Sequence, residues 1–122
     1  MNTRLLIVDD EAQIRELLSD FFHAKGYKTT TAASAAAASR CLDQEAFDLV
    51  ILDIILPDMQ GLDWLESIRQ AHPRLPVIVL TAMGFDEQLL QQARRCGASG
   101  YVSKSLPLNQ LLMEVHRVLK PA

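Results

Sequence analysis

The chain has 122 residues, of which 49% are hydrophobic and 22% are charged, and its formal net charge is −3. This length suits one domain with a real hydrophobic core and is too short for two. A nucleic-acid-binding domain would normally carry a basic face, and no apolar stretch approaches the roughly 20 residues of a membrane span. With no signal-peptide pattern at the N-terminus, we expect a single cytoplasmic domain over residues 1–122 that contacts neither membrane nor nucleic acid directly.

The first half of the chain shows two strand patterns, each followed by a helix pattern. The apolar run Leu5–Val8 predicts a strand, and the helix after it shows apolar residues at helical spacing and stops at Gly26. A weaker strand candidate, Lys28–Ala32, comes next. The alanine-rich stretch Ala32–Leu42 predicts a second helix because alanine is the best helix former, with Ser34 as its candidate N-cap.

The same alternation continues to the C-terminus. In chain order, the remaining predicted elements are a strand at Leu49–Leu52, a helix containing Leu62 to Arg69, a strand at Val77–Leu80, a helix at Glu87–Cys96, a weaker strand at Gly100–Ser103 and a helix at Leu108–Leu119. Short, uninterrupted, β-branched runs are typical of strands buried on both faces of a parallel sheet. The alternation therefore predicts an α/β fold of the (βα)₅, flavodoxin-like class, with a parallel five-stranded sheet in the order 2-1-3-4-5 and helices on both faces.

Polar side chains follow four of the predicted strands. Asp9 and Asp10 follow the first strand, Asp53 the third, Thr81 the fourth and Lys104 the fifth. Ligands of open α/β sheets bind outside the carboxyl ends of the strands, where the strand order reverses. We therefore expect these five side chains to converge at one edge of the sheet.

The residue types in this group are those of a phosphoryl-transfer site. Three neighbouring carboxylates cannot all stay ionised without a cation, and their oxygens suit Mg²⁺, which also binds substrate phosphates. A carboxylate can attack phosphorus to give an aspartyl-phosphate. Lys104 offers a positive charge and Thr81 a hydrogen bond for the phosphate oxygens.

Each of these residues also has an ordinary explanation. The Asp9–Asp10 pair, taken alone, is better explained by Asp10 capping the following helix. A single Asp, Thr or Lys after a strand is usually a loop residue. The site hypothesis rests on all four strand ends carrying the required type of residue. The two cysteines, Cys41 and Cys96, show no metal-binding spacing and are interpreted as small buried or half-buried side chains.

At this point the sequence resembles the receiver domain of two-component response regulators over essentially its whole length. The resemblance rests on four blocks in order: Leu6–Glu11, Asp53–Pro57 followed by Gly61, Val79–Ala82, and Gly97–Lys104. It implies a phosphorelay switch in which Asp53 accepts phosphate from a phosphohistidine on a sensor histidine kinase or a histidine phosphotransfer protein.

The resemblance also implies roles for individual residues. The Mg²⁺ ligands would be the carboxylates of Asp9, Asp10 and Asp53 and the main-chain carbonyl of Ile55. On phosphorylation, Thr81 would move toward the phosphate and Tyr101 would rotate inward.

The output of such a switch would pass through the last helices of the chain. The output surface would be Glu87–Cys96, Gly100–Ser103 and Leu108–Leu119, acting on a partner or an attached effector. A homodimer through this surface and plain core packing both explain the apolar stripe of the last helix. Such a domain catalyses its own phosphorylation and slow dephosphorylation and is not a turnover enzyme.

The chain departs from the family pattern at three positions. The family places Pro after the lysine with a cis bond, whereas Ser105 follows Lys104 here. Because a cis bond to serine costs on the order of 3 kcal/mol, we expect a strained cis bond or a rearranged trans loop. Ile55 and Met83 occupy positions that face the phosphate in the family. Neither can hold a water by hydrogen bonding, so we expect slow loss of phosphate.

Two other functions are compatible with the predicted fold. A flavin-binding redox module would need a loop rich in serine, threonine and glycine after the first strand, but the acidic run Asp9–Glu11 would repel a flavin phosphate. A degenerate receiver that serves only for interaction would lack one of the five site residues, and none is missing.

Overall fold

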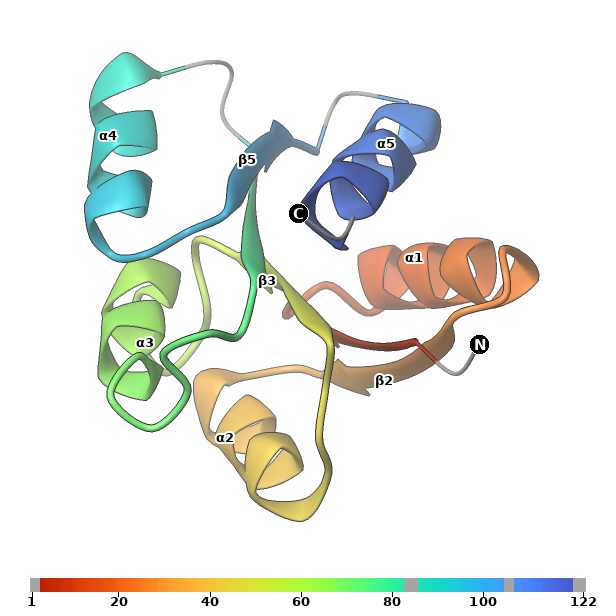
Figure 1. The fold of residues 1–122 in the computed structure, drawn as a ribbon, viewed down its shortest axis with the longest axis horizontal. Helices are drawn as coiled ribbons and strands as arrows, with labels where there is room; N and C mark the ends of the chain where they lie inside the picture. The colour runs from red at the N-terminus through yellow and green to blue at the C-terminus, as the bar shows by residue number, and fades with distance from the viewer. Residues whose placement is uncertain (1–2, 83–85, 105–106, 120–122) are drawn as a thin grey trace.

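The computed structural model describes residues 3–82, 86–104 and 107–119. In these ranges, five parallel strands form one sheet in the order β2-β1-β3-β4-β5 (Figure 1). The strands are β1 (Arg4–Val8), β2 (Lys28–Ala32), β3 (Leu49–Asp53), β4 (Val77–Thr81) and β5 (Gly100–Ser103). The predicted fold class and strand order are confirmed.

Helices cover both faces of the sheet. In Figure 1, α1 (Ala12–Ala24) and α5 (Leu108–Leu119) lie against one face, and α2 (Ala35–Gln44), α3 (Gly61–Ile68) and α4 (Glu87–Arg95) lie against the other. Each face has its own hydrophobic cluster of strand and helix side chains. No helix in the described ranges is both long enough and apolar enough to cross a membrane.

The central strands run one residue further than their apolar runs predict. β3 ends at Asp53 and β4 at Thr81, and every residue of both strands is buried. Pairing continues past the apolar residues, because Asp53 lies opposite Leu80 in the parallel register. The Ile54 N–H also donates to the Leu80 carbonyl at 3.0 Å. The sheet itself therefore fixes the two polar side chains at its edge.

The alanine-rich segment forms a helix, but this helix starts later than predicted. Ala32 is the last residue of β2, and α2 begins at Ala35 after the N-cap Ser34. The Ser34 hydroxyl accepts a hydrogen bond from the Ala37 N–H at 3.1 Å. Ala35 and Ala38 are buried against the sheet, where small side chains let the helix approach closely.

One arginine joins three segments at the end of the sheet where β4 and β5 begin, opposite the end that carries Asp53. Arg69 follows the last residue of α3, and its guanidinium donates hydrogen bonds to three main-chain carbonyls. The acceptors are His72 at 2.9 Å, Leu75 at 2.6 Å and Gly97 at 2.6 Å. Gly97 follows α4 with a φ of 99°, which favours glycine. Arg69 therefore fixes the end of α3, the entry to β4 and the end of α4 relative to one another.

Candidate functional site

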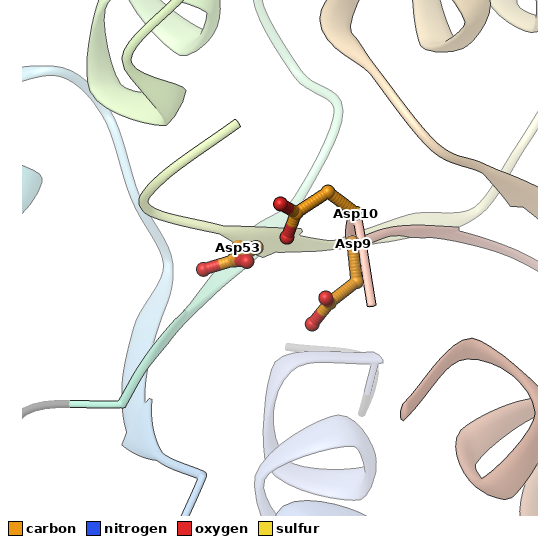
Figure 2. A group of neighbouring side chains, drawn as sticks. All are labelled: Asp9, Asp10 and Asp53. Carbon is orange, nitrogen blue, oxygen red and sulfur yellow. The ribbon is translucent and has the colours of Figure 1, made fainter. Parts of the chain in front are cut away.

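Three carboxylates converge at the carboxyl ends of β1 and β3. Asp9, Asp10 and Asp53 each offer an oxygen, and these oxygens lie within 4.8 Å of one another. Figure 2 shows the three side chains next to one another. Asp9 and Asp53 are 0% and 4% exposed, whereas Asp10 is exposed to solvent. Oxygen donors in this arrangement fit a hard divalent cation such as Mg²⁺.

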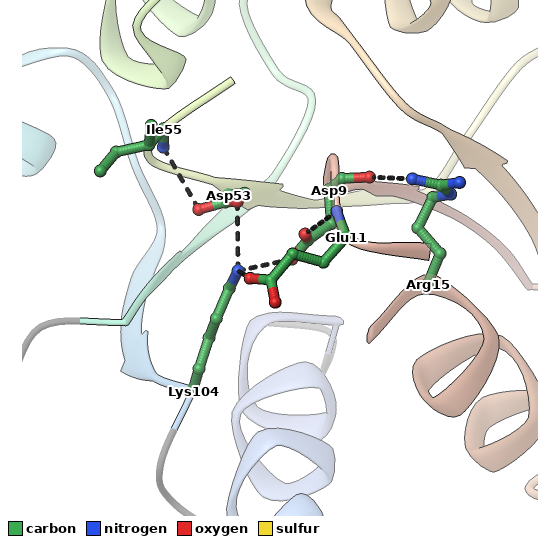
Figure 3. Close-up of polar contacts among 6 residues, drawn as sticks. All are labelled: Asp9, Glu11, Arg15, Asp53, Ile55 and Lys104. Atoms are coloured by element: carbon green, nitrogen blue, oxygen red, sulfur yellow. Dashed lines mark hydrogen bonds and ion pairs between the residues drawn. The ribbon is translucent and has the colours of Figure 1, made fainter. Parts of the chain in front are cut away.

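Lys104 brings a positive charge to the same carboxylates. Its Nζ lies 2.8 Å from Asp9 Oδ2 and 3.1 Å from Asp53 Oδ2 (Figure 3). It also lies 3.1 Å from Glu11 Oε1. Lys104 directly follows β5, and its N–H donates to the Thr81 carbonyl at 2.7 Å, which fixes the start of the side chain. Lys104 therefore pairs with residues from both carboxylate-bearing strand ends.

The site shifts the acidity of Asp53 and Lys104. Burial raises the pKa of Asp53, and the nearby Asp9 charge adds to this, while the Ile55 N–H at 3.2 Å and Lys104 oppose it. Burial would lower the pKa of Lys104, but its hydrogen bonds to Asp9, Glu11 and Asp53 outweigh burial and raise the pKa. Lys104 is therefore fully charged at neutral pH and offsets part of the negative charge around it.

The alternative role of Asp10 as a helix cap is wrong. The N-cap residue of α1 is Glu11, and the Glu11 N–H donates to Asp9 Oδ1 at 2.9 Å. Arg15 of α1 donates to the Asp9 main-chain carbonyl at 2.7 Å (Figure 3). Asp9 is thus held by α1 through both its side chain and its main chain.

Thr81 and Tyr101 lie near each other beside this cluster. Thr81 is fully buried at the end of β4, and Tyr101 lies on the neighbouring strand β5. Burial raises the pKa of the Tyr101 phenol, and an interaction with the Thr81 hydroxyl partly offsets the rise. The structure therefore brings together the two residues predicted to act as a switch pair.

A glycine lets α3 approach the main chain that carries Asp53. The Gly61 N–H donates to the Ile54 carbonyl at 2.7 Å. A Cβ at this position would collide with the Asp53 carbonyl oxygen and lie 2.9 Å from Ile54 Cα. The loop from Asp53 to Gly61 therefore turns back tightly on itself.

Sequence reasoning missed Glu11 as a partner of Lys104. Its one visible signal was its place as the third acid of the run Asp9–Glu11. Two further expectations concern the phosphate-facing position of Met83 and the conformation of the Lys104–Ser105 bond. They lie outside the residues that the structure describes.

The structure is a flavodoxin-like domain with a cluster of carboxylates that could hold a metal ion at the carboxyl ends of its strands. The family model for the response regulator receiver domain matches residues 5–116. The chain belongs to this family, whose members receive phosphate on an aspartate in two-component systems and interact with histidine kinases or phosphotransfer proteins.

Individual members of the family are similar to this chain over nearly its whole length. Sporulation initiation phosphotransferase F of Bacillus subtilis (strain 168) is 33% identical over 119 residues, which cover 98% of this chain and 95% of that protein. Regulatory protein AtoC of Escherichia coli (strain K12) is 38% identical over 117 residues, which are 96% of this chain but only 25% of that protein.

A solved structure agrees in three dimensions. Response regulator protein TrrA from Thermotoga maritima, in complex with Mg²⁺ and BeF, superposes with a TM-score of 0.86 at 34% identity. The match covers 96% of this chain and 99% of that one.

Proposed function

We propose that this domain accepts a phosphoryl group on Asp53 from the phosphohistidine of a sensor histidine kinase or a histidine phosphotransfer protein. The observation that carries the proposal is the buried Asp53 carboxylate, which shares Lys104 with Asp9 and lies beside Asp10. An isolated loop aspartate would have neither a lysine partner nor two converging carboxylates. The proposed domain boundaries are those of the whole chain, residues 1–122.

The chemistry needs a nucleophile and groups that position the phosphate. An Asp53 oxygen attacks phosphorus, the phosphorus–nitrogen bond of the donor breaks, and the departing imidazole nitrogen takes a proton from water. No general base is required, because the ionised carboxylate, the form that pairs with Lys104, attacks without losing a proton. Lys104 transfers its contact from Asp53 to a phosphate oxygen, and the Thr81 hydroxyl donates to another.

The acidic cluster suits a resident Mg²⁺ ion. Asp9, Asp10, Asp53 and the Ile55 main-chain carbonyl would hold it, and it would neutralise charge on the incoming phosphoryl group. Support comes from the convergence of the three carboxylates and from the relative TrrA, whose structure is a complex with Mg²⁺ and BeF.

The proposal is tested by intact mass after incubation with a small phosphodonor such as phosphoramidate. With Mg²⁺ we expect the mass to rise by one phosphoryl group, because the cation offsets the repulsion between three carboxylates and an anionic donor. With excess chelator we expect no gain. A gain that is equal with and without chelator would contradict the role of the cation, and no gain under either condition would contradict the proposed function.

The phosphate on Asp53 is proposed to be lost slowly. Ile55 follows Asp53 by two positions, and its exposed side chain offers no hydrogen bond to an attacking water. We expect Ile55→Asn to shorten the lifetime of the phosphorylated form several-fold, because an amide can hold and orient a water. The measurement is loss of radiolabelled phosphate after donor removal, with Leu17→Asn, an exposed position on α1, as control. An unchanged lifetime would refute this role of Ile55.

The output of the switch is proposed to pass through α4, β5 and α5 to a partner or an attached effector. Leu111 and Val115 of α5 are buried in the core, which supports core packing as the main role of the apolar stripe. Met113 on the same helix is 68% exposed, so a homodimer through this surface stays a proposal. The domain is proposed to work stoichiometrically and not as a turnover enzyme.

A further inference from the structure

A single side chain ties the loop between β3 and α3 to the start of α2. Asp58 lies in this loop, and its Oδ1 and Oδ2 accept hydrogen bonds from the Ala35 and Ala36 N–H groups, each at 2.9 Å. The helix's own N-cap, Ser34, accepts from Ala37. The first N–H groups of α2 therefore donate to two different residues, the local cap Ser34 and Asp58, which lies 23 positions after Ala35.

Other contacts hold the two ends of this loop. Ile55 pairs with Gln60 in an isolated antiparallel bridge, and the Gly61 N–H donates to the Ile54 carbonyl at 2.7 Å. The Ile55 N–H donates to Asp53 Oδ1 at 3.2 Å. These contacts hold the ends of the loop to each other, and Asp58 joins the loop to a separate element.

The end of β2, just before α2, contacts the other carboxylate-bearing strand end. The Asp9 N–H donates to the carbonyl of Ala32 at 3.0 Å, and Ala32 lies three positions before Ala35. The junction between β2 and α2 thus binds the main chain at Asp9 on one side and the Asp58 carboxylate on the other. The end of β1 and the loop after β3, which both carry site residues, are therefore held by the same junction.

The charge of Asp58 suits this contact. The N-terminus of α2 carries partial positive charge, which favours a carboxylate there. The hydrogen bonds from Ala35 and Ala36 lower the pKa of Asp58, so it is ionised at neutral pH. Asp58 is not one of the three carboxylates that converge around Asp53. Any effect on the site that works through its tie to α2 therefore acts through the main chain of the loop.

We propose that Asp58 is a positioning residue for the Mg²⁺ and phosphoryl site. By fixing the β3–α3 loop to the start of α2, it holds the Ile55 main chain in place beside Asp53. This inference rests on the proposed function, because it concerns the same site. Loss of a group that hydrogen-bonds directly to a metal ligand typically costs about 10-fold to 100-fold in metal affinity. Asp58 acts on Ile55 through three residues of main chain, so its effect should lie at the lower end of that range.

The test compares two ways of weakening the cap of the same helix. Asp58→Ala removes the tie to the loop, and Ser34→Ala removes the local cap while leaving the tie intact. Both variants, with Asp58→Asn, are titrated with Mg²⁺ by calorimetry and by the fluorescence of the single tryptophan, Trp64, on α3. Urea unfolding of each variant reports the loss of stability separately.

We expect Asp58→Ala to weaken Mg²⁺ binding about 10-fold, and Asp58→Asn to weaken it less because one acceptor oxygen remains. The Ser34→Ala variant should lose stability but bind Mg²⁺ like the parent. Phosphorylation of Asp58→Ala should recover at saturating Mg²⁺.

Two results would overturn the inference alone: Mg²⁺ affinity unchanged in both Asp58 variants, or affinity weakened equally by Ser34→Ala. A parent protein that binds no Mg²⁺ would overturn the proposed cofactor as well.

Discussion

Replacing Asp53 by Asn should abolish phosphoryl acceptance. An amide has nearly the same shape as a carboxylate but is not a nucleophile toward phosphorus, so the phosphorus–oxygen bond cannot form. The variant also removes one of two buried negative charges that contact Lys104, so it should fold at least as well as the parent. The measurement is intact mass after incubation with Mg²⁺ and phosphoramidate, where the parent gains one phosphoryl group and the variant gains none.

A matched variant separates the acceptor from other acidic residues. Asp43 is an exposed carboxylate near the C-terminal end of α2, and Asp43→Asn should gain the phosphoryl group like the parent. An undiminished mass gain in Asp53→Asn would mean that another carboxylate accepts the group. The exposed Asp10 would then be the first residue to replace.

Replacing Lys104 by Met should lower the free energy of unfolding by about 3 kcal/mol in Mg²⁺-free buffer. The lysine side chain is 11% exposed and pairs with the Asp9 and Asp53 side chains, which are 0% and 6% exposed. Removing one partner of a buried ion pair leaves uncompensated charge, which costs more than the pair itself contributes. Methionine keeps the length and apolar stem of lysine, so the change is mainly one of charge. Urea unfolding measures the difference.

The pH dependence of this loss of stability follows from the raised pKa of Lys104. Its Mg²⁺ dependence follows from the carboxylates that Lys104 contacts. The stabilising effect of Lys104 is fully present below the ordinary lysine value of 10.5 and is lost as pH rises through the folded pKa. The difference between parent and variant should therefore stay constant from about pH 6 to about pH 9. Mg²⁺ should reduce this stability difference, because the cation would neutralise the carboxylates that Lys104 contacts. For the same reason, Mg²⁺ should bind the variant at least as tightly as it binds the parent. Weaker Mg²⁺ binding by the variant would contradict this account.

Much of the fold was predictable because its three central strands, β1, β3 and β4, are buried on both faces. The runs Leu49–Leu52 and Val77–Leu80 admit few other interpretations, since a half-exposed strand would alternate polar and apolar residues. Strand ends were less predictable. Asp53 and Thr81 are polar, so the pattern stops before them, yet the ladder of the sheet continues through both.

The site was predictable where it depends on topology. Once β1 and β3 are neighbours, residues at their carboxyl ends must meet, which brings Asp9 and Asp53 together. Contacts of Glu11 and Asp58 were not predictable, because each joins segments far apart in the chain through one side chain. No periodicity or local propensity records such a contact. The alternative role of Asp10 as a helix cap was wrong because α1 begins one residue later than that role requires.

Arg69 has a consequence for how sequences of this fold can diverge. All three of its acceptors are main-chain carbonyls, which every residue type provides. Substitutions at His72 or Leu75 therefore preserve the acceptors, and only Gly97 is restricted, by its φ of 99°. Arginine itself has no equivalent, because a lysine ammonium lacks the planar fork that reaches several acceptors at once. These three hydrogen bonds therefore place no limit on side-chain substitutions in the two loops, whereas loss of the arginine would have to be compensated in both loops together.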